Sequence, residues 1–392
     1  MILKNANIHT MESKDYDKGY IKIENGLITE IGSMEDYKSG SDKEVDLSGL
    51  DVYPGFIDAH SHIGLMEDSL GFEGEDINES TDPVTPQLRV IDGINPMDEC
   101  FKEALEGGVT AVAVSPGSAN PIAGQISVFR TYGKRIDKMV IKSPIAIKFA
   151  LGENPKNTYK DSEQSPITRM ATAGIIYETL NKAKRYYEDK QRHKENKDEY
   201  DKPEYDAKLE ALVPLIRGEI KAHFHAHRAD DIFTALRISK EFNIEPVIVH
   251  ATQGHLIADE LKNENVDIFS GPFLSERSKP ELKGLTPESP GIMSKEGIKL
   301  SIVTDHSVIP EQYLTLCAAL AVREGMDEEE ALKAITLYPS LSLGVYDKIG
   351  SLKEGKYADI VVYNGTPLDF KNKPIMVMVE GNVVYDRLKE EK

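Results

Sequence analysis

FIDAHSHIGL, residues 56–65, places Asp58, His60 and His62 at alternate positions directly after an apolar run. Side chains on a β-strand alternate between two faces, so these three residues would share one face. Two imidazoles directed from one face into one cavity suit a divalent metal ion. An isolated His-x-His pair is about as typical of ordinary surface or core histidines as of a metal site. The rest of the chain therefore has to decide between these two interpretations.

Short apolar runs alternate with helical stretches on both sides of this segment, over residues 53–351. The runs include GVTAVAVSP, EPVIVHAT and IKLSIVTDH, and amphipathic segments such as ADDIFTALRISKEFN separate several of them. Near-continuous apolar strands that alternate with helices indicate a parallel sheet. A series of this length favours a closed (β/α)8 barrel over an open sheet. The sequence therefore predicts an α/β fold whose main domain is a TIM barrel.

Both ends of the chain contain the short strands and turn residues that are typical of β-hairpins. Residues 1–52 include YIKIENGLITEIGS, and residues 352–392 include ADIVVYNG and IMVMVEGNVVYD. We expect these two ends to form one small β-sandwich domain, with the barrel of residues 53–351 between them. Residues 182–210 are rich in charge and predict a solvated helical hairpin inserted into the barrel domain.

Residues that can bind metal fall at the ends of the predicted barrel strands. Catalytic residues of a (β/α)8 barrel lie at the C-terminal ends of its strands. Imidazoles and a carboxylate at the ends of four such runs therefore predict one metal site, suited to zinc and also to iron, manganese or nickel. The residues in question are His60, His62, His223, His225, His227, His250 and Asp305.

Asp305, which ends KLSIVTD, is a candidate for both metal binding and catalysis. A metal ion lowers the pKa of a bound water from about 15.7 towards 7 and so supplies hydroxide at neutral pH. A carboxylate beside the metal ion can take the proton of this water and then deliver it to a leaving group.

These motifs together resemble the amidohydrolase superfamily over nearly the whole chain. YPGFIDAHSH is similar to its opening His-x-His segment, HAHRADDI to its strand 5, VIVHAT to its strand 6 and SIVTDH to its strand 8. Residues 331–364 resemble the segment that leaves the barrel for the small β domain. The nearest branches are those of imidazolonepropionase and the prolidase-like metallodipeptidases.

The resemblance implies a ligand set. His60, His62, His225 and Asp305 would bind the buried metal ion. His250 would serve a second metal ion, or would act on the substrate by polarising the developing oxyanion.

Strand 4 of many relatives carries a lysine that reacts with carbon dioxide to give a carbamate bridging two metal ions. Lys148 in AIKFALGENPK is the candidate here, and Glu153 is the rival bridging ligand. We prefer Lys148, because burial of an unpaired ammonium is costly unless the residue has a special role.

Three further residues are candidates for substrate binding. His227 would lie on the substrate side of the metal ligands. Arg228 could pair with a substrate carboxylate, or with nearby Asp230 or Asp231. Gln125, in the segment SPGSANPIAGQ, could contact substrate from a loop at the barrel mouth, although turn chemistry explains this segment nearly as well.

Composition limits the partners that we expect. A formal net charge of −19 argues against nucleic acid. No stretch reaches the roughly 18 apolar residues that cross a bilayer, and MILKNANIHTMESKD lacks the apolar core of a signal peptide. Two cysteines fit a reducing compartment. We expect a cytoplasmic protein with a small-molecule substrate and no nucleic-acid or membrane partner, and leave homo-oligomerisation open.

The sequence thus predicts a metal-dependent amidohydrolase with one or two divalent cations. It would use a metal-activated hydroxide to hydrolyse the C–N bond of an amide, a cyclic amide or a dipeptide. One alternative is deamination of a heterocycle on the same scaffold. Another is a non-catalytic binding or assembly protein, although such proteins generally lose the metal ligands that this chain retains.

Overall fold

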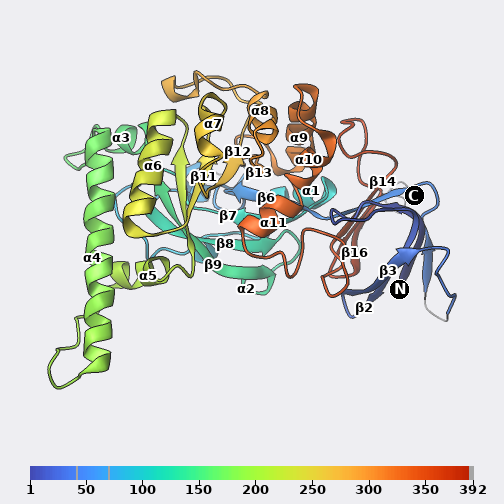
Figure 1. The fold of residues 1–392 in the computed structure, drawn as a ribbon, viewed down its shortest axis with the longest axis horizontal. Coiled ribbons are helices and arrows are strands. Elements are labelled where there is room, and N and C mark those ends of the chain that lie inside the picture. Colours follow the sequence, from blue (N-terminus) through green and yellow to red (C-terminus); the bar gives the residue numbers. More distant parts are fainter. Residues whose placement is uncertain (41–42, 69–70, 388–392) are drawn as a thin grey trace.

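The computed structural model describes residues 1–40, 43–68 and 71–387. Within these residues, two eight-stranded sheets lie at different places along the chain, and helices cover one of them (Figure 1). Residues 388–392, the end of the predicted terminal β segment, lie outside the described residues.

The barrel sheet occupies the middle of the chain and has the order β13-β12-β11-β10-β9-β8-β7-β6. Every residue of β7 and of β11 is buried, as expected for apolar strands with helices on one face and the barrel interior on the other. The strands are β6 (Phe56–Ser61), β7 (Val109–Val114), β8 (Ile122–Arg130), β9 (Val140–Ala150), β10 (Lys221–Ala226), β11 (Pro246–His250), β12 (Asp267–Ser270) and β13 (Leu300–Ile302).

One strand departs from the predicted (β/α)8 pattern, in which all strands are parallel. β8 runs antiparallel to both of its neighbours, β7 and β9. Antiparallel strands can be joined without a crossover helix. Residues 115–121 therefore form a loop, and residues 131–139 contain only the short helix α2 (Ile136–Met139). The other neighbouring strands of the barrel pair in parallel.

The first and last strands of the barrel, β6 and β13, meet at a seam. The Asp305 amide donates to the His60 carbonyl at 3.3 Å, and the His62 amide donates to the His306 carbonyl at 2.9 Å. The Asp58 carboxylate accepts from the Thr304 amide at 2.9 Å and from the Thr304 hydroxyl at 2.6 Å. The seam thereby fixes the C-terminal ends of β6 and β13 beside each other.

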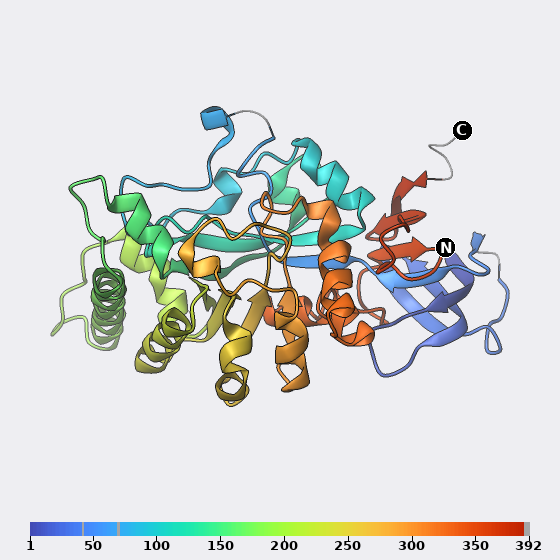
Figure 2. The same cartoon turned by 90° about the horizontal axis from the view of Figure 1, so that it is seen from above.

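Helices pack against the outside of the barrel, and Figure 2 shows several of them in a row along the strands. The longest, α4 (Arg169–Glu195), follows the capping residue Thr168 and continues beyond the barrel (Figure 1). Residues 182–210 comprise the end of α4, a connecting loop and the start of α5. Within the described residues, no helix combines the length and apolar character that a bilayer crossing requires. Besides α2 and α4, the α-helices of the described residues are α1 (Glu99–Glu106), α3 (Glu153–Tyr159), α5 (Ala207–Ile216), α6 (Ala229–Phe242), α7 (Ala258–Leu261), α8 (Ser289–Lys295), α9 (Leu314–Arg323), α10 (Glu328–Lys333) and α11 (Leu337–Ser342).

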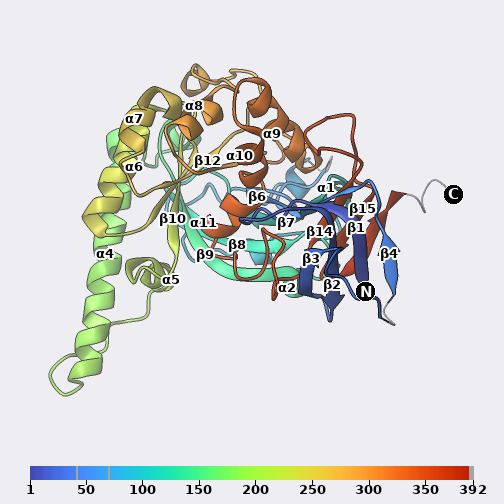
Figure 3. The same cartoon turned by 45° about the vertical axis from the view of Figure 1, so that its right-hand side comes forward.

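Strands from both ends of the chain pair in the second sheet, which lies at the end of the molecule opposite α4 (Figures 1 and 3). β5 joins the two ends, because it pairs in parallel with β1 and antiparallel with β14. Ile21, Val52 and Ile360 are fully buried in its core. The strands are β1 (Ile2–Ile8), β2 (Tyr16–Glu24), β3 (Leu27–Ser33), β4 (Glu44–Asp46), β5 (Asp51–Pro54), β14 (Ile360–Tyr363), β15 (Met376–Val379) and β16 (Asn382–Asp386).

Candidate metal centre

Two groups of potential metal ligands occur among the described residues, both at the C-terminal ends of barrel strands. The first group is His60, His62 and Asp305, and the second group is His225, His227 and His250. The ligand atoms within each group lie within 4.8 Å of one another. Residues from β6, β10, β11 and the segment after β13 therefore converge as the strand-end positions predict.

The first group is arranged around one carboxylate oxygen. Asp305 Oδ1 lies 3.3 Å from His60 Nε2 and 3.3 Å from His62 Nε2. His62 Nδ1 lies 2.7 Å from the Ser115 carbonyl, so that Nδ1 carries the proton and donates it. This bond leaves Nε2 of His62 with its lone pair directed at the group, the usual tautomer of a metal-binding histidine.

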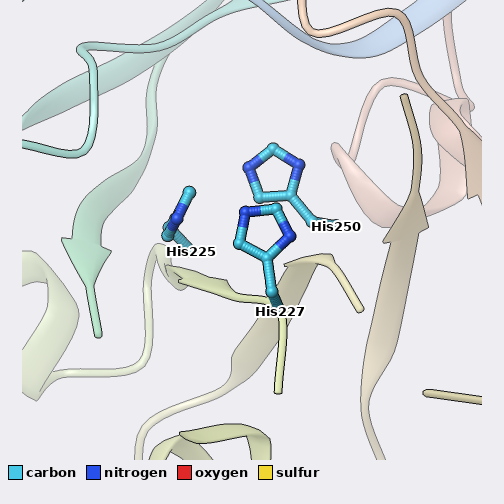
Figure 4. Close-up of side chains that lie close together, drawn as sticks. All are labelled: His225, His227 and His250. Atoms are coloured by element: carbon cyan, nitrogen blue, oxygen red, sulfur yellow. The ribbon is translucent and has the colours of Figure 1, made fainter. Parts of the chain in front are cut away.

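The second group consists of three imidazoles whose rings converge (Figure 4). The ring centroid of His250 lies 4.5 Å from that of His225 and 4.5 Å from that of His227. His250 Nδ1 lies 2.9 Å from the Gly271 carbonyl, to which it donates, so its Nε2 is an acceptor. The two ring nitrogens of His225 are buried and have no hydrogen-bond partner within the described residues.

Burial sets the charge of these groups. It lowers the pKa of His60 and His225 well below the usual histidine range, and it lowers the pKa of His250 to about 4. Burial also favours the neutral form of Asp305, but the imidazoles of His250 and His60 outweigh this effect and hold its pKa well below the usual range.

This donor set fits a divalent cation. Neutral imidazoles and an ionised carboxylate are the protonation states that metal binding requires. In the described part of the chain, His60 Nδ1 and Asp305 Oδ1 are also buried without a hydrogen-bond partner. A buried polar atom without a hydrogen-bond partner lowers the stability of the fold. Binding of a cation would give a partner to Asp305 Oδ1 and to one ring nitrogen of His225.

Lys148 extends from β9 into the first group. Its side chain is fully buried, and Nζ lies 3.3 Å from His60 Nε2. Burial lowers the pKa of Lys148 to about 7, although Asp305 acts in the opposite direction. Glu153, the rival candidate, is the first residue of α3, and its Oε1 accepts from Asn157 at 3.2 Å near the surface.

The backbone at this site is strained at three positions. His250, Ala251 and Asp305 have φ of 76°, 46° and 55°, a region that residues other than glycine rarely adopt. Such strain persists only where the surrounding structure enforces it, and it concentrates at functional sites. Two of the three positions are candidate ligands.

Asp58 does not join His60 and His62, contrary to the strand alternation. The pairing of β6 with β7 has a register irregularity between Asp58 and Ser61, and such a bulge breaks the alternation of side chains. The Asp58 carboxylate accepts instead from the His60 amide at 2.9 Å and from Thr304 across the seam. His223 also lies outside both groups, with its ring 5.3 Å from that of Phe269.

Two predicted substrate-binding residues have local partners. Arg228 donates to both carboxylate oxygens of Asp230, at 2.9 and 2.8 Å, and its side chain is 41% exposed. Gln125 lies on β8 and not in a loop, and its Nε2 donates to the Pro86 carbonyl at 3.5 Å.

Sequence reasoning missed one ionised residue at the site. Glu281 is only 2% exposed, and its Oε1 lies 3.6 Å from His227 Nε2. It belongs to SERSKPELK, a segment with the composition of a surface loop, and only its place after a predicted strand could have drawn attention to it.

Comparisons with known proteins identify the family of the chain. A family model described as the amidohydrolase family matches residues 209–384. A solved amidohydrolase from Thermotoga maritima MSB8 is 41% identical, with 98% of this chain and 100% of that chain covered and a TM-score of 0.94.

Two curated proteins show weaker similarity. Amidohydrolase tasK of Hapsidospora irregularis is 29% identical over 398 residues, which cover 94% of this chain but 40% of that protein. Imidazolonepropionase of Treponema denticola is 23% identical over 395 residues, covering 91% and 88% of the two chains. From the likeness to the Thermotoga structure and the matching family model, the chain belongs to the amidohydrolase family and is a hydrolase that acts on carbon–nitrogen bonds.

Proposed function

We propose that this chain is a metal-dependent amidohydrolase that hydrolyses an amide, a cyclic amide or a dipeptide bond in a small substrate. The observation that carries the proposal is the convergence of His60, His62 and Asp305 at the barrel mouth, with Asp305 Oδ1 3.3 Å from both Nε2 atoms. We propose one or two divalent cations, with zinc as the first candidate because the donors are imidazole and carboxylate.

A bound divalent cation would supply Lewis-acid chemistry and a water of lowered pKa. Asp305 would handle the two proton transfers of the reaction. As an ionised carboxylate, it takes a proton from the attacking water and delivers it to the departing amine nitrogen, so that the amine leaves neutral. The low pKa of Asp305 keeps it ionised at neutral pH, and only the ionised carboxylate can accept a proton.

The hydrogen bond of His250 favours ligation over oxyanion binding. Its Nδ1 donates to the Gly271 carbonyl, and Nε2 of a neutral ring in this tautomer accepts hydrogen bonds but cannot donate one. An oxyanion needs a donor. We therefore propose His250 as a ligand of a second cation. His225 would bind the same cation, because it lies in the second group and not with His60, His62 and Asp305 as the resemblance implies.

Lys148 is the candidate for the bridging group, ahead of Glu153. A neutral amine can attack carbon dioxide through its nitrogen lone pair, which forms an N–C bond and releases one proton to give a carbamate. The burial of Lys148, its pKa of about 7 and its position 3.3 Å from His60 Nε2 support this reaction.

The substrate-side residues are His227, Arg228 and Gln125. His227 lies beside the candidate ligands His225 and His250, so substrate bound at the cations would approach its ring. The exposed guanidinium of Arg228 could exchange Asp230 for a substrate carboxylate. Gln125 keeps the weakest support, because its amide already contacts the Pro86 carbonyl.

The test is a substrate screen with defined metal content. Dipeptides, N-acyl amino acids and imidazolone-type cyclic amides are incubated with chelator-treated protein and with the same protein after zinc is restored. The relative named imidazolonepropionase makes the cyclic amides the first class to examine. We expect C–N hydrolysis that needs zinc and that Asp305→Asn nearly abolishes. Equal hydrolysis without metal would contradict the proposal.

A further inference from the structure

A cavity of about 300 Å³ lies between the barrel and the second sheet. Its walls come from the C-terminal end of α1, the turn Glu311–Tyr313, the start of α9 and the segment that follows β14. Figures 1 and 3 show α1 beside the second sheet, and α1 contacts both β16 and the turn. Among the described residues that line the cavity, none belongs to the two groups of candidate metal ligands. Ligand sites occur preferentially at such junctions between domains.

Glu103 brings a negative charge to the wall of this cavity. It is half-buried, and its Oε2 accepts from the neutral side-chain amide of Gln312 at 3.0 Å. Within the described residues, no cationic side chain forms an ion pair with Glu103. Lys102, on the same helix, pairs with Glu99 at 2.8 Å and approaches Glu106 at 3.8 Å. Because water screens a half-buried charge less than an exposed one, Glu103 can attract a cation into the cavity.

The wall that carries Glu103 is held in place by a close backbone contact. Gly107 directly follows α1, and a Cβ at this position would lie 2.6 Å from the Gln312 Cα and 2.7 Å from its carbonyl oxygen. Glycine permits this approach, which any other residue would obstruct. The hydrogen bond between Gln312 and Glu103 spans the same contact. The carboxylate is therefore positioned before any ligand binds.

Aromatic side chains form another part of the wall. Tyr363 is 1% exposed, and its hydroxyl has no hydrogen-bond partner in the part of the chain that the structure describes. Tyr313 and Phe370 are 47% and 75% exposed and line the same cavity. Exposed apolar side chains that gather at one concave surface are typical of a binding site. The face of an aromatic ring also attracts a cation.

Lys373 is the one cationic residue among the described residues that line the cavity. It is exposed, and it forms no ion pair with Glu103 or Glu106, which line the cavity with it. A lysine at a rim can keep its ammonium group in solvent while its stem covers apolar surface. The two carboxylates therefore outweigh the single lysine, and the cavity favours a cation over an anion.

We propose that this cavity binds a small organic cation that consists of an aromatic ring and a primary ammonium group. The ammonium group would donate to the Glu103 carboxylate and to the Tyr363 hydroxyl. The ring would pack against Tyr313 and Phe370. The site is separate from the candidate metal centre, so the proposal does not depend on the metal-dependent function.

The experiment measures the binding of 2-phenylethylammonium to the full-length protein by isothermal titration calorimetry. Two analogues of the same shape serve as ligand controls: 2-phenylethanol is neutral, and 3-phenylpropionate is an anion. The variants are Glu103→Gln, which keeps an oxygen to accept from Gln312, and Tyr363→Phe, which removes only the hydroxyl. The matched control is Glu99→Gln, which removes a carboxylate from the same helix outside the cavity. Circular dichroism confirms that each variant is folded, and crystals soaked with the probe locate it.

We expect 2-phenylethylammonium to bind at one site at least about tenfold more tightly than either analogue, because a hydrogen bond between charged groups is stronger than one between neutral groups. Glu103→Gln should weaken this binding at least about tenfold, and Tyr363→Phe should weaken it less. Glu99→Gln should bind as wild type does. Added salt should weaken binding to wild type, and the soaked crystal should show the ring beside Tyr313 and Phe370.

Four results would overturn the proposal. One is the absence of binding to wild type, and another is equal affinity for 2-phenylethylammonium and 2-phenylethanol, which would mean that only apolar contact matters. A third is equal loss of binding in Glu103→Gln and Glu99→Gln, which would reflect the general surface charge. The fourth is density for the probe at the histidine groups and none in this cavity.

Discussion

Asp305 occupies a position where one carboxylate could serve two proton transfers. Its Oδ1 faces His60 and His62, and its φ of 55° is held against the preference of an L-residue. We expect Asp305→Asn to keep at least one zinc ion, because the remaining ligands persist. Its kcat should fall by roughly 10²–10⁴, the range for general acid–base catalysis. Zinc content and steady-state kinetics on a substrate from the screen measure the two effects.

A purely structural role for Asp305 makes a different prediction. Asparagine caps turns about as well as aspartate and tolerates the same backbone region. If Asp305 only stabilises the local turn, Asp305→Asn will turn over substrate at nearly the wild-type rate.

The lowered pKa of Lys148 leads to a prediction about how carbamate formation depends on pH. Burial lowers its pKa from the ordinary lysine value of 10.5 to about 7, so the reactive neutral amine becomes populated as pH rises through about 7. In metal-free protein we expect carbamate formation to be weak below that pH and to increase through it. Carbon-13 NMR with labelled bicarbonate detects the carbamate, and Lys148→Met is the control without an amine.

Two outcomes would contradict carbamate formation at Lys148. A carbamate signal that rises only near pH 10, or one that survives in Lys148→Met, would exclude the proposed reaction at Lys148.

The seam between β6 and β13 connects two ligand-bearing elements. Asp58 accepts hydrogen bonds there from the His60 amide, the Thr304 amide and the Thr304 hydroxyl, at 2.9, 2.9 and 2.6 Å. Burial raises the pKa of Asp58 to about 6, so the carboxylate is largely ionised at neutral pH. The seam therefore depends on one side chain that accepts from both strands.

We expect Asp58→Asn to destabilise the protein by roughly 1–3 kcal/mol, because its amide group faces donors and leaves a buried one unpaired. Zinc affinity should also fall by about 10–100-fold, as for other groups that orient ligands. Urea unfolding and zinc titration measure the two effects. Thr304→Val, which removes only the hydroxyl donor, should have the smaller effect, and the reverse order would contradict this role for Asp58.

The elements show why some features follow from the sequence and others do not. His60, His225 and His250 converge because apolar runs that end in histidine place these side chains at one end of a barrel. β8 was not predicted, because neither hydrophobicity nor turn residues in SPGSANPIAGQ reveal the direction of a strand. Glu281 was not predicted either, since its burial arises from contacts with Glu153 and His227, which are distant in sequence.

A buried ion pair joins the barrel to the terminal sheet. Arg130 at the end of β8 contacts Asp359, which directly precedes β14, and their side chains are 8% and 3% exposed. Asp359 also accepts from the Glu380 amide at 2.7 Å. The pair is therefore positioned to couple the stability of the two parts.

We expect Asp359→Asn to lower the free energy of unfolding by about 1–3 kcal/mol, because it removes the buried charge partner of Arg130 and leaves only the half-exposed Glu380, 3.2 Å from Nη2, to pair with the guanidinium. Urea unfolding measures the change. Asp137→Asn removes an exposed pair with Arg135 and should leave stability unchanged within error. Equal stability of Asp359→Asn and wild type would mean that the two sheets are not coupled through this pair.

The proposed function requires that His60, His62 and Asp305 hold a divalent cation for C–N bond hydrolysis. The most direct measurement is an anomalous difference map at the zinc absorption edge, collected from crystals of the zinc-loaded protein. We expect a strong peak within bonding distance of His60 Nε2, His62 Nε2 and an Asp305 carboxylate oxygen. A map from fully loaded protein whose zinc peaks all lie away from these three residues would contradict it.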